Sequence, residues 1–382
     1  MQIVCKTREL REAVGFAKKM LPKATTLPVL EGIMLEAQGG EFRIMAHDLE
    51  CGVILKVSGA RVEKEGRALV PGKAFSLLVE KFTAEETAID ASDGNVTIQC
   101  GSSRAELTGM DPDLYPELPS QQEYREVVVV LEELLPALRE TFSFTNPSGW
   151  EAYVRSVLWE VEEEDVLNLV ATDTHRLVVR RVPGVKTGGT RGAWLLPVAG
   201  LARMAGVLSG STGHAAVRFS ENFARIITAG GAFYMRLLSG SYPPYRQVIP
   251  REDAPVSVVV DAGVLRSALE RARVLKQGSK DDPVVMIAPV AGADVLTVKT
   301  VRCEYGALEE VLEAEVRGGS GFPVYLNSKY LLSALRGASD RVVLDIYAPL
   351  KPVVVRRAGS EDYLALVLPV RVPETEAAEK CA

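Results

Sequence analysis

The chain has 382 residues, of which 47% are hydrophobic and 25% are charged, and its formal net charge is −6. These proportions are typical of globular proteins, and the length predicts two or three domains. They argue against a protein that coats itself with nucleic acid, although a basic patch inside an acidic surface is compatible with them.

Several kinds of segment and site are not expected. No apolar run approaches the ~18 residues of a membrane span. The start, MQIVCKTREL, lacks the basic and apolar segments of a signal peptide, so we expect a cytoplasmic protein without a membrane partner. The cysteines are isolated and none has a histidine at metal-ligand spacing, which predicts small buried hydrophobes, no metal site and no cofactor. They are Cys5, Cys51, Cys100, Cys303 and Cys381.

Six amphipathic helices are predicted, in two alternating types. Helices of the first type begin at Thr7, Leu131 and Asp261. Helices of the second type follow a strand and a polar or proline-containing turn at Pro71, Pro197 and Asn327. In sequence number, the steps are 124 and 130 for the first type, and 126 and 130 for the second. The helices therefore mark an internal repeat.

Turns between strands repeat at nearly the same interval. Glycine turns lie at Gly101, Gly230 and Gly359, and both steps in sequence number are 129. The phrases YPELP and YPPYRQVIP begin at Tyr115 and Tyr242, a step of 127. These features indicate three copies of one unit, each made of two similar halves with one helix per half. Short β-branched strands complete each half, which predicts an α+β fold of antiparallel sheets with helices on one face.

The predicted helices separate apolar from basic side chains. In the first helix Leu10, Val14 and Ala17 recur at helical spacing and are expected to face a sheet. The same holds for Leu265, Leu269 and Ala272 of the fifth helix, and for Leu331, Leu332 and Leu335 of the sixth. The basic residues of these helices have two possible interpretations. They form an ordinary solvated surface, or the equivalent helices of a symmetric assembly turn their basic faces in the same direction. Pro136 is expected in the first turn of the third helix or at a bend.

The stretch LNLVATDTHRLVVRRV, residues 167–182, joins two apolar strands through a polar turn. Asp173 and His175 would share one face of an extended segment, where they could pair as two members of a catalytic triad do. The chain has no G-x-S-x-G elbow, no Walker-type loop and no metal-ligand cluster, which argues against an enzyme. Asp48 occupies the same place in the first copy, so a turn held by the Asp carboxylate is the simpler interpretation.

The order and spacing of several phrases resemble the bacterial sliding clamps, the beta subunits of the replicative DNA polymerase III. The phrases are TLPVLEGIMLEA, VPGKAF, ATDTHRL, YPPYRQVIP, LNSKYLLSAL and LVLPVR, and the resemblance extends from Met1 to about Val372. It implies three similar clamp domains, each with antiparallel sheets and two helices, at residues 1–122, 123–250 and 251–372, with a flexible acidic tail at 373–382. It also implies a head-to-tail homodimeric ring, in which no sheet edge stays exposed.

The resemblance further implies a non-catalytic processivity factor that encircles double-stranded DNA without reading its sequence. Its partners would be a second copy of itself, the clamp loader, the catalytic subunit of the replicative polymerase, and other polymerases and repair proteins that carry short linear motifs. A moderate positive potential would suit sliding, because dense basic contacts raise affinity and hinder movement. The residues expected to face DNA are Lys18, Lys23, Lys73, Lys81, Arg203, Arg273 and Lys329.

By position, the resemblance places a partner-peptide groove between the second and third domains. Its residues would be Val154, Thr172, Thr174, His175, Arg176, Leu177, Pro243, Gln247, Val248, Leu350, Pro352, Leu366, Leu368, Pro369, Val370 and Arg371. The apolar members would form a dry pocket for large side chains, and His175 and Arg176 would donate hydrogen bonds at its rim. Family geometry places the dimer contact on edge strands near Cys100 and Lys276.

Departures from the family pattern leave alternatives open. Thr174 stands where glycine or serine is frequent, Gln247 replaces a frequent arginine, and Ala24 stands where an arginine often follows Lys23. The chain is therefore compatible with the main replicative clamp and with a specialised second clamp. It is also compatible with a scaffold of the same fold that serves repair polymerases and does not encircle DNA.

Overall fold

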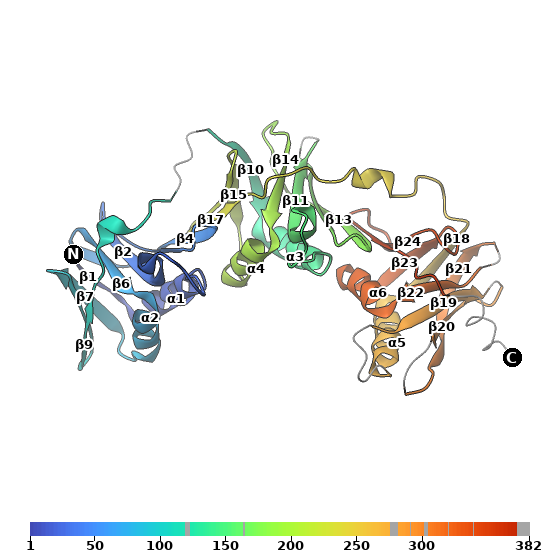
Figure 1. Ribbon diagram of the computed structural model, residues 1–382, viewed down its shortest axis with the longest axis horizontal. Helices are drawn as coiled ribbons and strands as arrows, with labels where there is room; N and C mark the ends of the chain where they lie inside the picture. The colour runs from blue at the N-terminus through green and yellow to red at the C-terminus, as the bar shows by residue number, and fades with distance from the viewer. Residues whose placement is uncertain are drawn as a thin grey trace. The chain divides into compact units, whose positions relative to one another are not determined.

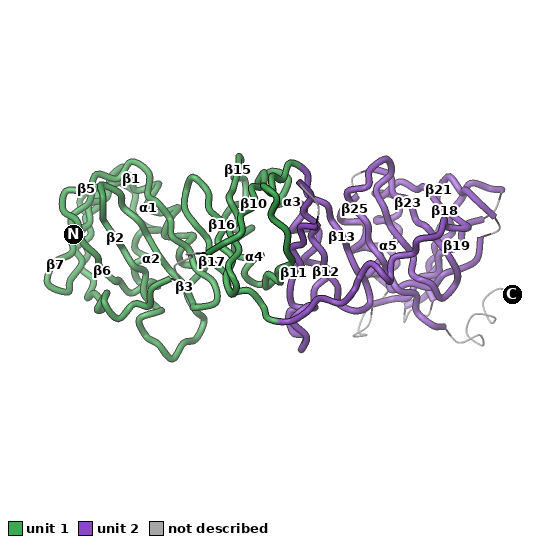
Figure 2. The backbone as a smooth tube through the Cα atoms, turned by 90° about the horizontal axis from the view of Figure 1, so that it is seen from above, with its two compact units in different colours: residues 1–135, 184–239 green, residues 136–183, 240–382 purple. Residues whose placement is uncertain are grey.

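The computed structural model describes residues 1–118, 123–162, 165–275, 282–290, 292–301, 305–319, 321–338 and 340–372. The chain divides into two compact units (Figure 2). Unit 1 comprises residues 1–135 and 184–239, and unit 2 comprises residues 136–183 and 240–382. Each unit thus combines segments from more than one copy of the repeat, and the domain boundaries predicted from the sequence stay predictions.

The six predicted helices are present (Figure 1). They are α1 (Thr7–Lys18), α2 (Gly72–Lys81), α3 (Leu131–Phe142), α4 (Val198–Val207), α5 (Ala262–Val274) and α6 (Ser328–Ala334). Short 3₁₀ turns are η1 (Pro28–Glu31), η2 (Pro112–Leu114), η3 (Tyr153–Arg155), η4 (Tyr245–Gln247) and η5 (Leu335–Gly337). The apolar stripe of α1 is buried as predicted, with Leu10, Val14 and Ala17 each at most 1% exposed.

Two details of the helix prediction need correction. Pro136 lies inside α3, which begins at Leu131, so the first of its two predicted places, the first turn, is wrong. Leu332 is half-buried, whereas its neighbours Leu331 and Leu335 on the same helical stripe are fully buried. Leu332 borders a cavity beside α6 and is therefore less covered than they are.

The helices α5 and α6 begin at side chains that cap them. Asp261 accepts a hydrogen bond from the N–H of Val264 at 2.8 Å. Asn327 accepts from the N–H groups of Lys329 and Tyr330 at 3.0 and 3.2 Å. These donors have no partner inside the helix, and each such cap typically contributes ~1 kcal/mol of stability.

The strands of unit 1 other than β14 form two antiparallel sheets. The strands of this unit are β1 (Gln2–Lys6), β2 (Gly32–Gln38), β3 (Glu41–His47), β4 (Cys51–Lys56), β5 (Arg61–Lys64), β6 (Gly66–Pro71), β7 (Glu86–Ser92), β8 (Asn95–Cys100), β9 (Ser103–Thr108), β10 (Arg125–Val130), β14 (Gly192–Pro197), β15 (His214–Phe219), β16 (Phe223–Thr228) and β17 (Gly231–Arg236). One sheet has the order β5-β1-β7-β8-β9, and the other has the order β10-β15-β16-β17-β4-β3-β2-β6.

The strands of unit 2 form one continuous sheet. They are β11 (Ser156–Val161), β12 (Leu167–Thr172), β13 (Arg176–Val182), β18 (Val256–Asp261), β19 (Val284–Val290), β20 (Val295–Val301), β21 (Glu309–Gly318), β22 (Val324–Asn327), β23 (Arg341–Ile346), β24 (Val353–Arg357) and β25 (Tyr363–Val367). Their order is β11-β12-β13-β25-β24-β23-β18-β21-β20-β19-β22.

In each unit the last strand of one copy of the repeat pairs with a strand of the preceding copy. In unit 1, β17 pairs antiparallel with β4, with Gly231 opposite Leu55. In unit 2, β25 pairs antiparallel with β13, with Val367 opposite Arg176. We call β4·β17 the unit 1 junction and β13·β25 the unit 2 junction. These pairings connect successive copies by main-chain hydrogen bonds.

The cysteines that the structure describes are buried free thiols, as predicted: Cys5, Cys51 and Cys100. Burial raises the pKa of the Cys5 and Cys51 thiols to about 12, so they keep their protons at neutral pH. Cys303, Cys381 and the predicted acidic tail at 373–382 lie outside the described residues.

Candidate functional site

The polar turn between β12 and β13 is held by Asp173. One of its carboxylate oxygens accepts hydrogen bonds from the N–H groups of His175 and Arg176, both at 3.1 Å. Thr174 adopts a φ of 77°, and its N–H donates to the hydroxyl of Thr172 at 3.1 Å. A carboxylate that satisfies two backbone donors stabilises such a turn. The predicted structural role of Asp173 is confirmed.

Arg176 is 7% exposed and is engaged inside the protein. Its Nε donates to the second carboxylate oxygen of Asp173 at 2.9 Å, and its Nη1 donates to the hydroxyl of Ser333 on α6. The guanidinium also lies over the rings of Tyr330 and Phe144, 4.6 and 5.4 Å from their centroids. A buried charge needs such partners. Arg176 therefore ties the turn to α6 instead of offering free donors at a rim, which corrects the expectation from the sequence.

His175 connects the same turn to two further elements. Its ring stacks on Tyr330 of α6, with the centroids 5.8 Å apart and an interplanar angle of 16°. Its carbonyl oxygen accepts a hydrogen bond from the N–H of Leu368, just after β25, at 3.0 Å. Three elements of unit 2 thus meet at this turn.

These residues border a cavity of about 320 Å³ in unit 2. Most of the predicted groove residues line it: Thr172, Thr174, His175, Arg176, Leu177, Pro243, Gln247, Val248, Pro352, Leu366 and Leu368. The lining combines Pro, Leu and Val side chains with a small number of polar groups. This composition is typical of sites that bind an apolar side chain and orient it by hydrogen bonds.

The remaining predicted groove residues do not line this cavity: Val154, Leu350, Pro369, Val370 and Arg371. Val154 is buried at 6% exposure, and Leu350 projects from the surface at 62% exposure. The N–H of Val370 donates to the carbonyl oxygen of Tyr325 in β22 at 2.7 Å, so the chain leaves the cavity after Leu368.

Four lining residues were not predicted: Tyr153, Tyr242, Pro244 and Tyr245. Tyr245 donates to Glu160 at 2.6 Å, whereas the hydroxyl of Tyr242 is buried without a hydrogen-bond partner among the described residues. Burial raises the pKa of Tyr242, so its phenol stays protonated and can donate. The phrase YPPYRQVIP contains both tyrosines, and aromatic residues flanking its prolines were the available signal.

Known protein families match the chain in three consecutive segments. Residues 1–119 match the N-terminal domain of the DNA polymerase III beta subunit, residues 141–244 match its central domain, and residues 246–371 match its C-terminal domain. The chain belongs to the DNA polymerase III beta subunit family.

Relatives and solved structures agree with this membership. The beta sliding clamp of Staphylococcus aureus is 25% identical over 363 residues, which cover 92% of this chain and 94% of the relative. The fold is shared with the DNA polymerase sliding clamp of Bacillus subtilis, with a TM-score of 0.91 at 23% identity over 98% of this chain and 100% of that one. The DNA polymerase III beta subunit of Pseudomonas aeruginosa has a TM-score of 0.89 at 21% identity, covering 97% and 100% of the two chains.

Beta subunits are sliding clamps, the non-catalytic processivity factors of DNA polymerase III, and this is the function of the chain. The three-domain α+β fold predicted from the repeat is confirmed, and a homodimeric ring is typical of the family. DNA, a DNA polymerase and further copies of the chain are the partners that this membership implies. An enzyme built on Asp173 and His175 is excluded, and the Asp173 carboxylate is in any case engaged by the turn and by Arg176.

The residues predicted to face DNA lie on helices or in the loop after α1. They are Lys18 (α1), Lys23 (loop), Lys73 and Lys81 (α2), Arg203 (α4), Arg273 (α5) and Lys329 (α6). Arg203 donates to Asp48 at 2.5 Å, and Arg273 donates to Asp282 at 2.9 Å. Lys18, Lys23 and Lys73 have no ion-pair partner in the part of the chain that the structure describes. These three are therefore the most available to phosphates.

A second cavity in unit 2, of about 490 Å³, is strongly basic. Its lining residues are Phe142, Ser143, Thr145, Arg176, Arg266, Glu270, Arg273, Lys329, Leu332, Ser333 and Arg336. Arg266 and Arg336 were not among the predicted DNA residues, although each lies seven positions from a predicted one on its helix or on the turn that continues it. That spacing brings both onto one face with Arg273 and Lys329.

Across the ranges that the structure describes, no helix has both the length and the apolar character needed to cross a membrane. Nor do three or more His, Cys, Asp or Glu side chains converge there as they would around a metal ion.

Proposed function

We propose that two copies of this chain close head to tail into a ring that encircles duplex DNA in the cytoplasm. The ring tethers the catalytic subunit of the replicative polymerase and moves along DNA without sequence preference. Its further partners are the clamp loader and other polymerases and repair proteins, which dock through short linear motifs. The clamp domains are proposed at 1–122, 123–250 and 251–372, with the acidic tail at 373–382.

The strand pairing between successive copies of the repeat supports the ring most directly. The fourth strands of the three copies are β4, β13 and β21, and their last strands are β9, β17 and β25. Two of the three combinations are made within the chain, β17 with β4 and β25 with β13. This leaves β9 as a sheet edge, and among the described pairings the Glu309–Glu313 half of β21 pairs with β20 alone. In a ring of two chains, β9 of one chain would pair with β21 of the other, as β17 pairs with β4 and β25 with β13. Neither edge would then stay exposed.

The two free edges both carry charged side chains. Arg104 and Glu106 are exposed on β9, and Glu309 and Glu313 are carried by the free half of β21, where Glu309 also pairs with Lys299. Arg104 can pair with Glu313. Opposite charges on neighbouring strands are favourable by roughly 0.2–1 kcal/mol per pair. Val311, between the glutamates, is 62% exposed, so it has apolar surface to bury in such a contact.

The basic helices support sliding on phosphates. Lys18, Lys23 and Lys73 are exposed, and α5 and α6 concentrate further cations around the basic cavity of unit 2. Ion pairs such as Arg203 with Asp48 lower the positive potential without abolishing it. A limited number of phosphate contacts keeps affinity low enough for movement.

The apolar cavity beside the Asp173 turn supports peptide docking. Leu177, Leu366 and Leu368 provide the apolar walls for an anchoring side chain. The free hydroxyl of Tyr242 and the ring of His175 are the groups that would hydrogen-bond to the peptide. Arg176 stabilises the turn that positions them.

Topology provides the test of the ring. The protein is assembled on a nicked circular DNA, the circle is then cut at one site, and retention is measured by gel filtration. We expect release after cutting, because a ring slides off an end. Equal retention on circular and linear DNA would mean that the protein binds without encircling. The matched control is Arg104→Glu, which should weaken the dimer and abolish retention on the circle, as followed by light scattering.

The same measurement separates the alternatives. A chain that is monomeric at micromolar concentration in light scattering is the scaffold and not the ring. A dimer that is retained on circles but stimulates repair polymerases and not the replicative one is a specialised second clamp.

A further inference from the structure

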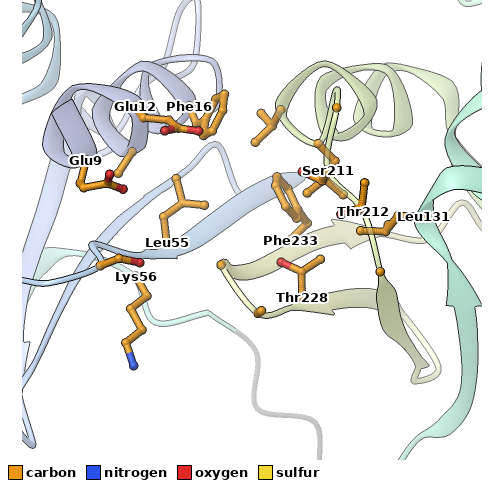
Figure 3. A pocket seen from close by; sticks show the side chains of 18 of the residues that line it. Glu9, Glu12, Phe16, Leu55, Lys56, Leu131, Ser211, Thr212, Thr228 and Phe233 are labelled. Atoms are coloured by element: carbon orange, nitrogen blue, oxygen red, sulfur yellow. The ribbon is translucent and has the colours of Figure 1, made fainter.

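A cavity of about 550 Å³ in unit 1 has no part in the function proposed above. It lies at the unit 1 junction, bordered by α1, β4, the end of α4 and the turn that precedes β17 (Figure 3). Its apolar walls include Phe16, Leu55, Val207 and Phe233. The volume falls within the ~300–1,000 Å³ that is typical of ligand pockets.

The repeat shows what stands at the corresponding place in unit 2. The first-type helices of the first two copies begin at Thr7 and Leu131, a step of 124 in sequence number. The same step leads from Phe16 in α1 to Glu140 in α3. The turns at Asp48 and Asp173 correspond, and their step matches Leu55 with Arg180. The glycine turns before the last strands of the second and third copies lie at Gly230 and Gly359. Their step matches Thr228 with Arg357. The hairpin of β24 and β25 is three residues longer, so Asp362, whose carbonyl oxygen accepts from the N–H of Arg181, corresponds to Gly230, whose carbonyl oxygen accepts from the N–H of Lys56.

In unit 2 these four positions form one partly buried ion network, with Arg180 at its buried centre. Arg180 donates to Glu140 at 2.8 Å and also to the carboxylate of Asp362. Arg357 donates to Glu140 at 2.8 Å and to Asp362 at 2.7 Å. The network spans the unit 2 junction and fills the space between α3, β13 and the hairpin of β24 and β25.

Unit 1 keeps the strand pairing of this junction but not the network. Its four corresponding residues, Phe16, Leu55, Thr228 and Gly230, cannot form ion pairs and do not bridge the space. All four line the cavity. The hollow therefore reflects the side chains of unit 1 together with its shorter hairpin between β16 and β17.

Acidic side chains border the mouth of this cavity. Glu9 and Glu12 lie on the face of α1 that is turned toward the hollow (Figure 3). Neither has an ion-pair partner within the described ranges of the chain. Lys56 extends away from the hollow in the same view, and its ammonium group pairs with Glu41. The lysine of the lining is thus already neutralised.

Other charged groups nearby leave the balance negative. Glu132 accepts a hydrogen bond from the N–H of Gly213 at 2.9 Å, at the edge formed by the loop before β15. The ammonium group of Lys19 lies 5.4 Å from the centroid of the Phe16 ring, which shows that a cation is accommodated there. At and beside the cavity, the carboxylates of Glu9, Glu12 and Glu132 therefore outnumber the ammonium group of Lys19. The imidazole of His214 also lines the cavity.

We propose that this cavity is a second docking pocket, for a protein segment that carries a large apolar side chain next to a lysine or arginine. The apolar side chain enters between Phe16, Leu55 and Phe233, and the cation pairs with Glu9 and Glu12 at the mouth. A second copy of this chain is a poor occupant because its net charge is −6. The pocket acts independently of DNA and of the groove in unit 2, so the proposal goes beyond the clamp function.

A random heptapeptide library displayed on phage tests the pocket. It is selected on the full wild-type protein and depleted on Ser211→Trp, because Ser211 lines the cavity and an indole there fills it. We expect surviving sequences to contain Phe, Leu, Met or Trp beside Lys or Arg. No surviving binder, or survivors without a basic residue, overturns the proposal. Thr212→Trp replaces Ser211→Trp if the latter does not fold.

The best peptide is then synthesised and its affinity is measured by calorimetry. Glu9→Lys combined with Glu12→Lys should weaken it at least tenfold, and the corresponding Gln pair should weaken it less. These positions are on the surface of α1, so unchanged thermal unfolding shows that the fold is kept. His175→Ala combined with Leu368→Ala should leave the affinity unchanged. Loss of binding in that groove variant, or full binding by the Lys pair, contradicts the proposal without affecting the clamp function.

Discussion

The two junctions have the same strand pairing and different contents. In unit 1, β17 pairs with β4 beside a cavity lined by Phe16 and Leu55. In unit 2, β25 pairs with β13 beside a partly buried network that contains Glu140 and Arg180 at the corresponding positions. Strand pairing uses backbone N–H and C=O groups, so it tolerates a complete change of side chains. A repeated fold can therefore place a rigid ion network and an open pocket at equivalent points.

The turns after β3 and β12 differ in the same way. Asp48 and Asp173 each accept two backbone hydrogen bonds within their own turn, and the following residue has a φ of 72° and 77°, respectively. The second oxygen of Asp48 binds Arg203 from α4, whereas that of Asp173 binds Arg176 from the turn itself. The turn is thus a shared scaffold that an arginine ties to a helix in both units: Arg203 is carried by α4 in unit 1, whereas Arg176 begins β13 in unit 2 and reaches Ser333 of α6.

The largest expected effect comes from breaking the ion network of the unit 2 junction. Arg180→Met leaves the partly buried carboxylates of Glu140 and Asp362 to share Arg357 alone, and should lower the free energy of unfolding by about 3 kcal/mol. Leu55→Met, the corresponding change in unit 1, should cost less than about 1.5 kcal/mol. Guanidinium unfolding of both variants provides the measurement. Similar losses in the two variants would show that the network does not distinguish the junctions.

A smaller effect is expected in the groove. His175→Ala combined with Leu368→Ala should weaken a synthetic peptide that copies a polymerase docking motif, with each change contributing about 1–3 kcal/mol. Glu50, which corresponds to His175 in unit 1, supplies the control Glu50→Ala, which should not change this affinity. Calorimetry gives the affinity and light scattering checks that the dimer persists. Unchanged affinity in the double variant would mean that the peptide binds elsewhere.

Acid should destabilise unit 1 through His47, whose counterpart in unit 2 is Thr172. Burial lowers the pKa of His47, against the opposing effects of the Pro116 carbonyl and Asp48. The unfolded state therefore binds a proton that the folded state does not, so stability is present above about pH 6.5 and falls as the pH drops toward the folded pKa. Unfolding measured from pH 7.5 to 5 should show this loss, and His47→Gln should reduce it. An identical pH profile for both proteins would assign the acid sensitivity to other groups.

The smallest expected effect concerns DNA. Lys23→Ala should reduce the slope of log affinity for DNA against log salt concentration by about 1, which corresponds to one lost phosphate contact. The reason is that Lys23 is exposed and has no ion pair within the described residues. Arg203→Ala should change the slope less, since Arg203 is held by Asp48 at the unit 1 turn. Affinities for a short duplex at several salt concentrations give both slopes. A larger change for Arg203 would mean that the ion pair opens on DNA.

Much of the fold and part of the site were predictable. The helices, glycine turns and threefold repeat follow from local rules: apolar spacing for α1, a side-chain cap at Asp261, and a positive φ at Gly101 and Gly359. The role of Asp173 was predictable for the same reason, because its partners are two and three residues away.

The groove was only partly predictable because its surroundings come from distant segments. Tyr330 packs on His175 from a helix more than a hundred residues later, and nothing in the polar turn itself indicates that contact. Tyr242 belongs to the phrase YPPYRQVIP, so the sequence indicated this residue. The burial of its hydroxyl without a partner among the described residues depends on the packing of segments around the cavity, including β25 and the Asp173 turn. The family resemblance places Val154 and Leu350 in the groove, but neither residue lines the cavity.

Local periodicity and turn chemistry in this chain were sufficient to establish the three copies, their helices and the family, because each of those signals lies within a few residues. The contents of the two junctions follow from packing instead. Arg180 meets Asp362 across 182 residues and Arg357 meets Glu140 across 217. Such contacts arise where strands from different copies pair, so the network in unit 2 and the cavity in unit 1 become visible when the folded backbone brings those side chains together.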